Sequence, residues 1–183
     1  MDQIVDLIKA DQARWHALSV VESLDIATAC IGAGFVRNLV WDHLHGRTSD
    51  CRQFDLDVLW FDFDRSDPKI DLELEHRLSD LDPSFDWSVK NQARMHGRNG
   101  DAPYESVSDA MRYWPETATA IAAQRSADTC RIIAPFGLSD LHNMILRPTS
   151  SGSHKLRAFE DRLVNKDWRS MWPNIHIERK TVG

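Results

Sequence analysis

The sequence predicts an α+β (α/β) domain in which a mixed β-sheet is flanked by helices. Residues 54–63 (FDLDVLWFDF) place alternate side chains on two faces, as a strand does. Residues 71–81 (DLELEHRLSDL) repeat leucine at helical steps. Segments of the two kinds alternate along the chain, which is typical of helices packed against a sheet. We also expect additional N-terminal helices and a C-terminal α/β extension.

Helices are predicted where apolar residues recur every three or four positions. Asp11 is a candidate cap inside the first helical segment, and Ser19 is another. Gly46 fits the end of the second segment, and Pro115 separates the fourth from the fifth. The predicted helices are residues 2–24, 35–45, 71–81, 107–114, 116–124 and 155–164, with one more helical turn after Ser139.

Strands are predicted where polar and apolar residues alternate or where a short apolar run lies between turn residues. A polar turn at residues 65–69 follows the clearest strand, and a serine-rich loop lies at 149–153. The predicted strands are residues 54–63, 87–89, 130–134, 145–147 and 175–177.

Length and composition indicate an ordinary globular protein. The 183 residues fit one domain, so residues 1–183 are expected to form a single domain with one core and without repeats or linkers. Hydrophobic residues make up 42% and charged residues 27%, which excludes disordered, collagen-like and coiled-coil classes. Three widely spaced cysteines, no signal-peptide pattern and no apolar stretch near ~20 residues indicate a cytoplasmic protein with no membrane partner.

The net charge of −6 is unevenly distributed. Residues 50–86 hold 12 acidic and 4 basic residues, whereas residues 87–183 hold 10 acidic and 14 basic residues. Bulk, non-specific nucleic-acid binding depends on many basic contacts to phosphate, so the overall acidity argues against it. The basic second half leaves room for a small phosphate-bearing ligand.

Asp55 and Asp57 carry the clearest chemical signal. They share one face of the predicted strand, because side chains two residues apart point the same way. Their like charges repel unless a cation lies between them. Mg²⁺ prefers carboxylate oxygens and usually keeps substrate phosphates in its shell. We therefore predict that both residues are catalytic and bind one Mg²⁺ or a two-metal site; a solvated strand face is the alternative.

Two glycines before the second helical segment are candidates for phosphate binding. Gly32 and Gly34 allow close approach of a ligand to the backbone. A helix N-terminus attracts phosphate through its free N–H groups and its dipole. Arg37 either contacts a phosphate there or pairs with Asp42 or Asp55 as a structural brace.

Residues 31–61 resemble the nucleotidyltransferases of the DNA polymerase β superfamily. They are most similar to the version found in tRNA CCA-adding enzymes and poly(A) polymerases. Ala33 between the glycines and Asn38 in place of aspartate depart from that pattern. The matching residues are Gly32, Gly34, Val36, Arg37, Asn38, Gly46, Arg47, Asp55 and Asp57.

Nearly the whole chain resembles a bacterial family of uncharacterised nucleotidyltransferase-like proteins. The resemblance implies a nucleotidyltransferase fold and transfer of a nucleotidyl group from a nucleoside triphosphate (NTP) to an acceptor, which is a small molecule, a protein or a tRNA. The segments that carry it include residues 37–42, 57–58, 87–96, 114–119 and 135–141.

The resemblance also implies a third carboxylate on a neighbouring strand, as a base or a metal ligand. Asp86, directly before the strand at 87–89, is the candidate, and the end of a turn is its alternative role.

Lys90, Arg94 and Arg98 recur at four-residue steps and are expected on one helical face. Lys90 and Arg94 are therefore predicted to hold phosphates or the acceptor, and Asn91 either to orient a base or ribose or to cap an internal turn. A solvated helix is the alternative.

Other reaction classes have no support in the sequence. Zinc-ligand spacing, the G-x-S-x-G motif and the G-x-x-x-x-G-K-[ST] motif are all absent. The first hypothesis is therefore a Mg²⁺-dependent nucleotidyltransferase. The second is a catalytically inactive nucleotide- or partner-binding module on the same fold.

Overall fold

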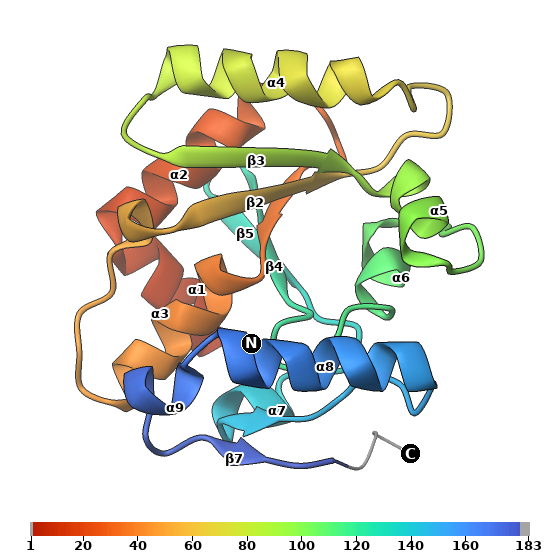
Figure 1. Cartoon of the computed structure of the whole chain (residues 1–183). Coiled ribbons are helices and arrows are strands. Elements are labelled where there is room, and N and C mark those ends of the chain that lie inside the picture. Colours follow the sequence, from red (N-terminus) through yellow and green to blue (C-terminus); the bar gives the residue numbers. More distant parts are fainter. Residues whose placement is uncertain (1, 180–183) are drawn as a thin grey trace.

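A computed structural model describes residues 2–179 of the chain, which are arranged as a sheet with helices around it (Figure 1). The helices are α1 (Asp2–Ala10), α2 (Gln12–Glu22), α3 (Gly34–Leu44), α4 (Pro68–Leu81), α5 (Met95–Asn99), α6 (Val107–Met111), α7 (Ser139–His142), α8 (Ser153–Asn165) and α9 (Trp168–Met171). The strands are β1 (Cys30–Gly32), β2 (Asp55–Trp60), β3 (Asp86–Asn91), β4 (Ala122–Ser126), β5 (Thr129–Ile133), β6 (Ile145–Leu146) and β7 (His176–Ile177).

Five strands form one mixed sheet in the order β3-β2-β1-β4-β5. The β2–β3 pair is parallel, and the other three pairs are antiparallel. A separate parallel pair joins β6 to β7. In Figure 1, α4 lies beside β3, whereas α8, α9 and β7 lie on the far side of β2 from α4. The predicted α+β class with a mixed sheet and flanking helices is confirmed.

Local signals set several helix ends. The Asp11 carboxylate accepts the backbone N–H of Arg14 at 3.0 Å and caps α2, as the sequence predicts. Gly46 follows α3 with a φ of +65°, a conformation that favours glycine. Helix α4 begins one turn earlier than predicted, because Asp67 caps it and Pro68 fits its first turn.

Two helix predictions are wrong. Within residues 116–124, the predicted helix is replaced by irregular backbone followed by β4, which pairs with both β1 and β5. Ala122 and Ala123 are fully buried there, so packing between two strands outweighs the helix propensity of alanine. The expected basic helical face at 90–98 is also absent, because Lys90 lies in β3 and Arg98 in the short α5.

The sheet separates two groups of buried apolar residues. Leu56, Val58 and Trp60 of β2 belong to the main core. Leu59 belongs to a smaller cluster that also contains Cys30 and Met111. Strand alternation puts Asp55 and Asp57 on the same side of β2 as Leu59, away from the main core.

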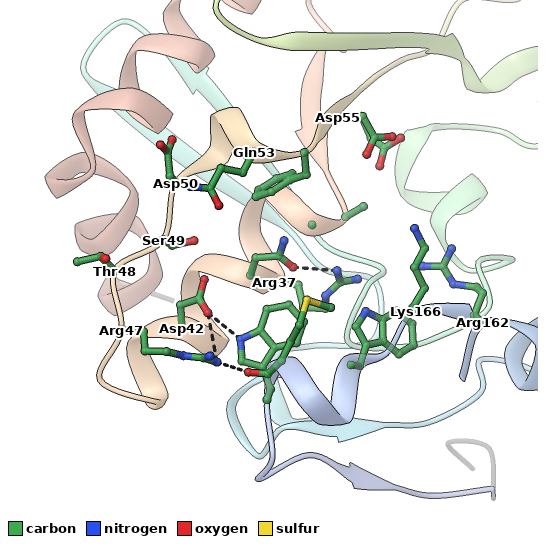
Figure 2. Close-up of a pocket in the computed structure, with 18 residues that line it drawn as sticks. Arg37, Asp42, Arg47, Thr48, Ser49, Asp50, Gln53, Asp55, Arg162 and Lys166 are labelled. Atoms are coloured by element: carbon green, nitrogen blue, oxygen red, sulfur yellow. Dashed lines mark hydrogen bonds and ion pairs between the residues drawn. The ribbon is translucent and has the colours of Figure 1, made fainter. Parts of the chain in front are cut away.

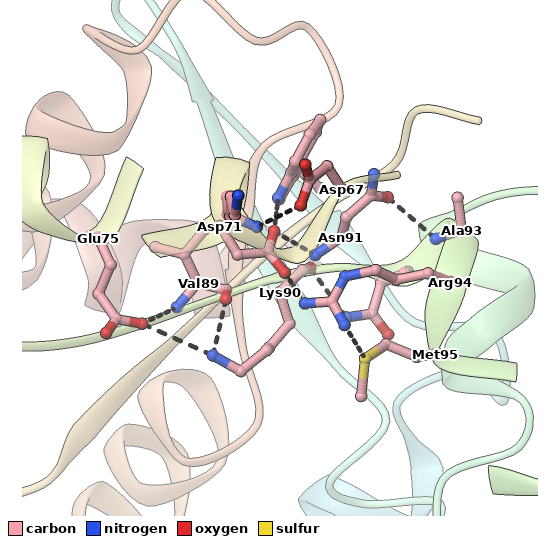
Figure 3. A network of polar contacts seen from close by, with 12 residues as sticks. Asp67, Asp71, Glu75, Val89, Lys90, Asn91, Ala93, Arg94 and Met95 are labelled. Carbon is pink, nitrogen blue, oxygen red and sulfur yellow. Dashed lines mark hydrogen bonds and ion pairs between the residues drawn. The ribbon is translucent and has the colours of Figure 1, made fainter. Parts of the chain in front are cut away.

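Side chains of α4 accept hydrogen bonds from backbone N–H groups at the outer edge of β3 (Figure 3). The Asp71 carboxylate accepts the Asn91 backbone N–H at 2.9 Å, and Glu75 accepts that of Val89 at 3.0 Å. An edge strand leaves such N–H groups without a neighbouring strand, so these two carboxylates occupy positions that another strand would fill.

Asp71 is also the centre of a buried polar network. Only 1% of it is exposed, and its carboxylate accepts the indole N–H of Trp60 at 2.8 Å while forming an ion pair with Arg94. A buried carboxylate in this position stabilises the fold as long as all of its partners remain.

We expect Asp71→Ala to lower the free energy of unfolding by about 3 kcal/mol, because it leaves Arg94, the Trp60 indole and the β3 edge without their acceptor. Glu73→Ala, on the exposed side of the same helix, is the control and should change stability by less than about 0.5 kcal/mol. Urea unfolding followed by circular dichroism measures both. Equal effects of the two substitutions would contradict the role given to Asp71.

Candidate functional site

A cleft of about 670 Å³ lies between the start of α3, the segment that leads into β2, and the α8–α9 region (Figure 2). Asp55 and Asp57 line it from β2, and Arg162 and Lys166 line the facing wall on the α8 side. Asp42, Arg47, Thr48, Ser49 and Asp50 line the other parts. The volume falls within the range of small-molecule binding sites.

Asp57 is partly buried in the cleft wall, and its environment alters its protonation. Burial raises the pKa of Asp57 to about 6, and the neighbouring charge of Asp55 adds to the rise. Arg162, Arg37 and Lys166 oppose the rise because their positive charges favour the carboxylate. The charged form of Asp57 is therefore unfavourable, and a cation bound between the two carboxylates would stabilise it.

The two predicted phosphate-binding glycines have different surroundings. Gly34, at the first turn of α3, lines the cleft. A Cβ on Gly34 would meet the flexible ends of two side chains, the Asn38 amide at 3.3 Å and Arg37 Nη2 at 3.6 Å. Gly32 lies at the end of β1, where a Cβ would come within 2.9 Å of Leu59 Cδ1 and 3.2 Å of Trp114 Cη2. Close packing therefore accounts for glycine at position 32.

Ala33, between the glycines, adopts φ 54° and ψ −121°, a backbone conformation that favours glycine. Its N–H donates to the Ile121 carbonyl at 2.9 Å, and its own carbonyl accepts the Arg37 N–H at 3.1 Å. These two hydrogen bonds hold the strained backbone turn that precedes α3 at the edge of the cleft.

Arg37 is buried, and its side chain forms part of the cleft lining. Its guanidinium donates to Thr119 Oγ1 at 2.9 Å and to Asn38 Oδ1 at 2.8 Å. It also lies 5.2–5.9 Å from the ring centroids of Trp41, Trp168 and Trp172. Burial lowers its pKa to about 10, although the nearby Glu116 acts in the opposite direction.

Arg37 forms no ion pair with Asp42 or Asp55 among residues 2–179, so neither predicted brace is formed. Asp42 instead accepts the Trp172 indole N–H at 2.8 Å and pairs with Arg47 at 3.6 Å. The brace that does exist runs through the tryptophan rings, which attract the guanidinium by cation–π contact.

The other predicted site residues lie outside the cleft lining. Asp86 pairs in register with Asp55 across the parallel β2–β3 ladder and is exposed. Lys90 pairs with Glu75 at 3.6 Å, and Arg94 pairs with Asp71 (Figure 3). Asn91 is buried, and its side-chain amide donates to the carbonyl of Asp62 at 2.8 Å. These contacts assign Lys90, Asn91 and Arg94 structural partners away from Asp57.

Arg162 and Lys166 are cleft residues that sequence reasoning missed. Arg162 is in the last turn of α8, and its Nε donates to the buried Glu116 carboxylate at 2.5 Å. Lys166 follows the helix end. Their four-residue spacing was the available signal, but they lie far along the chain from Asp55 and resemble any solvated helix face.

A buried arginine holds the far wall of the cleft. Arg14 of α2 is 0% exposed and donates to the Phe35 carbonyl at 2.9 Å and to Ser49 Oγ at 2.9 Å. It therefore ties α2 both to α3 and to the loop that leads into β2, and positions Ser49 on the cleft lining.

Asp55 and Asp57 together fit Mg²⁺, although they do not form a complete metal cage. Within the described part of the chain, no group of three His, Cys, Asp or Glu side chains is placed to hold a metal. Mg²⁺ commonly takes one or two carboxylates and completes its shell with water and substrate phosphates. The two carboxylates suit that kind of site, which a phosphate-bearing ligand would complete.

The mixed sheet, the strained turn at the start of α3 and the paired carboxylates at the start of β2 define a site of the nucleotidyltransferase type. The chain belongs to the nucleotidyltransferase family, whose model matches residues 19–177. No curated protein matches the sequence. No helix in residues 2–179 is both long and apolar enough to span a membrane.

Solved structures confirm the nucleotidyltransferase fold. One, described as an NMR structure that reveals a CCA-adding enzyme head domain, matches with a TM-score of 0.87 and 28% identity over 98% of this chain and 96% of that one. A CCA-adding enzyme in complex with CTP matches at 0.63 and 11% identity over 96% of this chain and 43% of that one.

The Thermotoga maritima CCA-adding enzyme complexed with tRNA matches at 0.58 and 13% identity, over 98% of this chain and 42% of that one. The chain therefore spans less than half the length of these two CCA-adding enzymes.

The two glycines should respond differently to alanine. Gly32→Ala is expected to cost about 1–3 kcal/mol of stability, because Leu59 and Trp114 must move to admit a methyl group. Gly34→Ala should leave stability within about 0.5 kcal/mol and weaken binding in the cleft. Thermal unfolding and titration with an NTP measure the two effects. A stable Gly32→Ala protein would contradict the packing role.

Asp57→Asn should stabilise the metal-free protein at pH 8. The folded state raises the pKa of Asp57 to about 6, so stability decreases as pH rises from about 4 to about 6 and the full penalty applies above that range. Asparagine removes the penalty, which is up to about 3 kcal/mol. Unfolding in EDTA should show the gain at pH 8 and none at pH 4. A gain of equal size at both pH values would refute this explanation.

Proposed function

We propose that this protein is a Mg²⁺-dependent nucleotidyltransferase that transfers a nucleotidyl group from an NTP to an acceptor. The observation that carries the proposal is the pair of carboxylates, Asp55 and Asp57, at a cleft whose opposite wall supplies Arg162 and Lys166. Family membership and the fold agree with this reaction class.

Each group in the cleft has a defined role in the proposed reaction. Asp55 and Asp57 hold Mg²⁺, which when bound would neutralise phosphate charge and favour ionisation of the attacking hydroxyl. Gly34 lines the cleft at the α3 N-terminus, where backbone N–H groups can face a phosphate. Transfer would proceed in line, break the bond between the α- and β-phosphates, and release pyrophosphate. Catalysis would then rely mainly on positioning and charge neutralisation.

One observation favours the second candidate, a nucleotide-binding module without catalysis. Asp86 was predicted as the third carboxylate, yet it does not line the cleft, and residues 2–179 contain no metal-holding group of three. A two-carboxylate site can bind a metal–nucleotide complex and still lack a base for the acceptor hydroxyl. Binding of NTP without transfer distinguishes this candidate from the enzyme.

The acceptor is best identified by transfer itself. Two CCA-adding enzymes of similar fold were solved with CTP and with tRNA, which supports an NTP donor and puts tRNA among the acceptors to test. Each α-labelled NTP would be incubated with the protein, Mg²⁺ and separate fractions of small metabolites, proteins and tRNA from a bacterial extract. The fraction that becomes labelled names the acceptor class.

Asp57→Asn should reduce transfer by at least about 100-fold, since it removes one of two ligands from the proposed metal site. Asp64→Asn is the matched control, because Asp64 is exposed and lies beyond β2 on the same segment. Initial rates of label transfer and circular dichroism would be measured for both variants. Unchanged transfer by a folded Asp57→Asn protein would exclude the proposed mechanism.

A further inference from the structure

The cleft wall opposite Asp55 carries two basic side chains that still have unpartnered N–H donors within residues 2–179. Arg162 and Lys166 line the cleft, and Figure 2 shows both side chains extending from the α8 region toward Asp55. They remain beside a partly buried carboxylate without forming an ion pair with it.

Arg162 is anchored in a way that leaves its two terminal guanidinium nitrogens available. Its Nε donates to Glu116, which is 0% exposed, and its guanidinium lies 5.4 Å from the centroid of the Trp168 ring. Within residues 2–179, its two terminal nitrogens have no hydrogen-bond partner. A guanidinium anchored through Nε presents those two nitrogens as a preoriented pair, and such pairs suit phosphate oxygens.

Lys166 supplies a second donor close to the first. It is exposed at the C-terminal end of α8, one helical turn after Arg162. Its ammonium forms no hydrogen bond or ion pair in the described part of the chain. A lysine without such a contact is not needed to hold the fold, so its position on the cleft calls for a ligand-based explanation.

The charge pattern indicates which ligand groups these donors meet. The carboxylates of Asp55 and Asp57 repel anions unless a metal lies between, so only phosphates that share this metal can approach them. The remaining phosphates of a triphosphate need counter-charge from the facing wall. Arg162 and Lys166 present unpartnered donors to the cleft, whereas Arg37 is enclosed by tryptophan rings and its one unpartnered donor, Nε, is buried.

We propose that Arg162 and Lys166 form a triphosphate-binding wall across the cleft from the carboxylate pair, with Glu116 and Trp168 holding Arg162 in place. The wall binds the β- and γ-phosphates of the NTP and stabilises the charge that accumulates on pyrophosphate as it leaves. The inference rests on the proposed function for its ligand.

Lys166→Gln is the first test, because this exposed side chain has no contact whose loss would unfold the protein. Titration calorimetry with inorganic tripolyphosphate in EDTA should show about fivefold weaker binding than the wild type. Arg162→Lys keeps a charge beside Glu116 but removes the fork, and should also weaken binding about fivefold. The double variant should lose at least about tenfold. Arg157→Gln, an exposed site on α8, should stay within about twofold.

The inference fails if wild-type protein does not bind tripolyphosphate, or if Lys166→Gln and Arg162→Lys bind it as tightly as the wild type does. The assay uses neither metal nor acceptor, so its result is independent of transfer. Weakened binding in both variants supports the wall even if no acceptor is labelled. Unchanged binding overturns it even if Asp57→Asn abolishes transfer.

Discussion

Asp55 and Asp57 stand two residues apart on β2, and the charge of Asp57 is costly first because Asp57 is partly buried and second because Asp55 repels it. Basic side chains elsewhere in the cleft partly offset that cost. Arg37, Arg162 and Lys166 come from two distant helical segments and lower the pKa of Asp57, yet burial still raises it to about 6. A site in this condition is stabilised further when a cation binds. The charge of Asp57 lowers the stability of the metal-free fold at the position where the proposed chemistry requires charge. Such a loss of stability is common in functional sites.

Helix α3 connects the parts of the cleft. Its first turn carries Gly34, its second turn carries Arg37, and Trp41 further along contacts the ring of Trp172 at 5.2 Å between centroids. Arg37 contacts the same ring, so α3 and α9 are joined by cation–π and aromatic contacts around one buried guanidinium. The wall that carries Lys166 is therefore positioned by the helix whose N-terminus lines the cleft.

The sequence predicted what depends on local pattern. Strand alternation placed Asp55 and Asp57 on one face, and Asp11 and Gly46 marked helix ends. It failed where packing decides: alanine-rich residues at 116–124 favour a helix in isolation, but burial between β1 and β5 turns their second half into a strand. It also missed Arg162 and Lys166, because only folding brings them to Asp57. Lys90 and Arg94 were predicted as phosphate ligands because the local sequence does not show that they pair with Glu75 and Asp71 of α4.

The α4 carboxylates at the outer edge of β3 affect how the protein meets other chains. An exposed strand edge is a template on which another polypeptide can add a strand. At this edge the N–H groups of Val89 and Asn91 are already bonded to Glu75 and Asp71. An incoming strand would have to displace both carboxylates and separate Asp71 from Arg94. The β3 edge is thereby guarded against strand addition, and the sheet can end there without a further strand to close it.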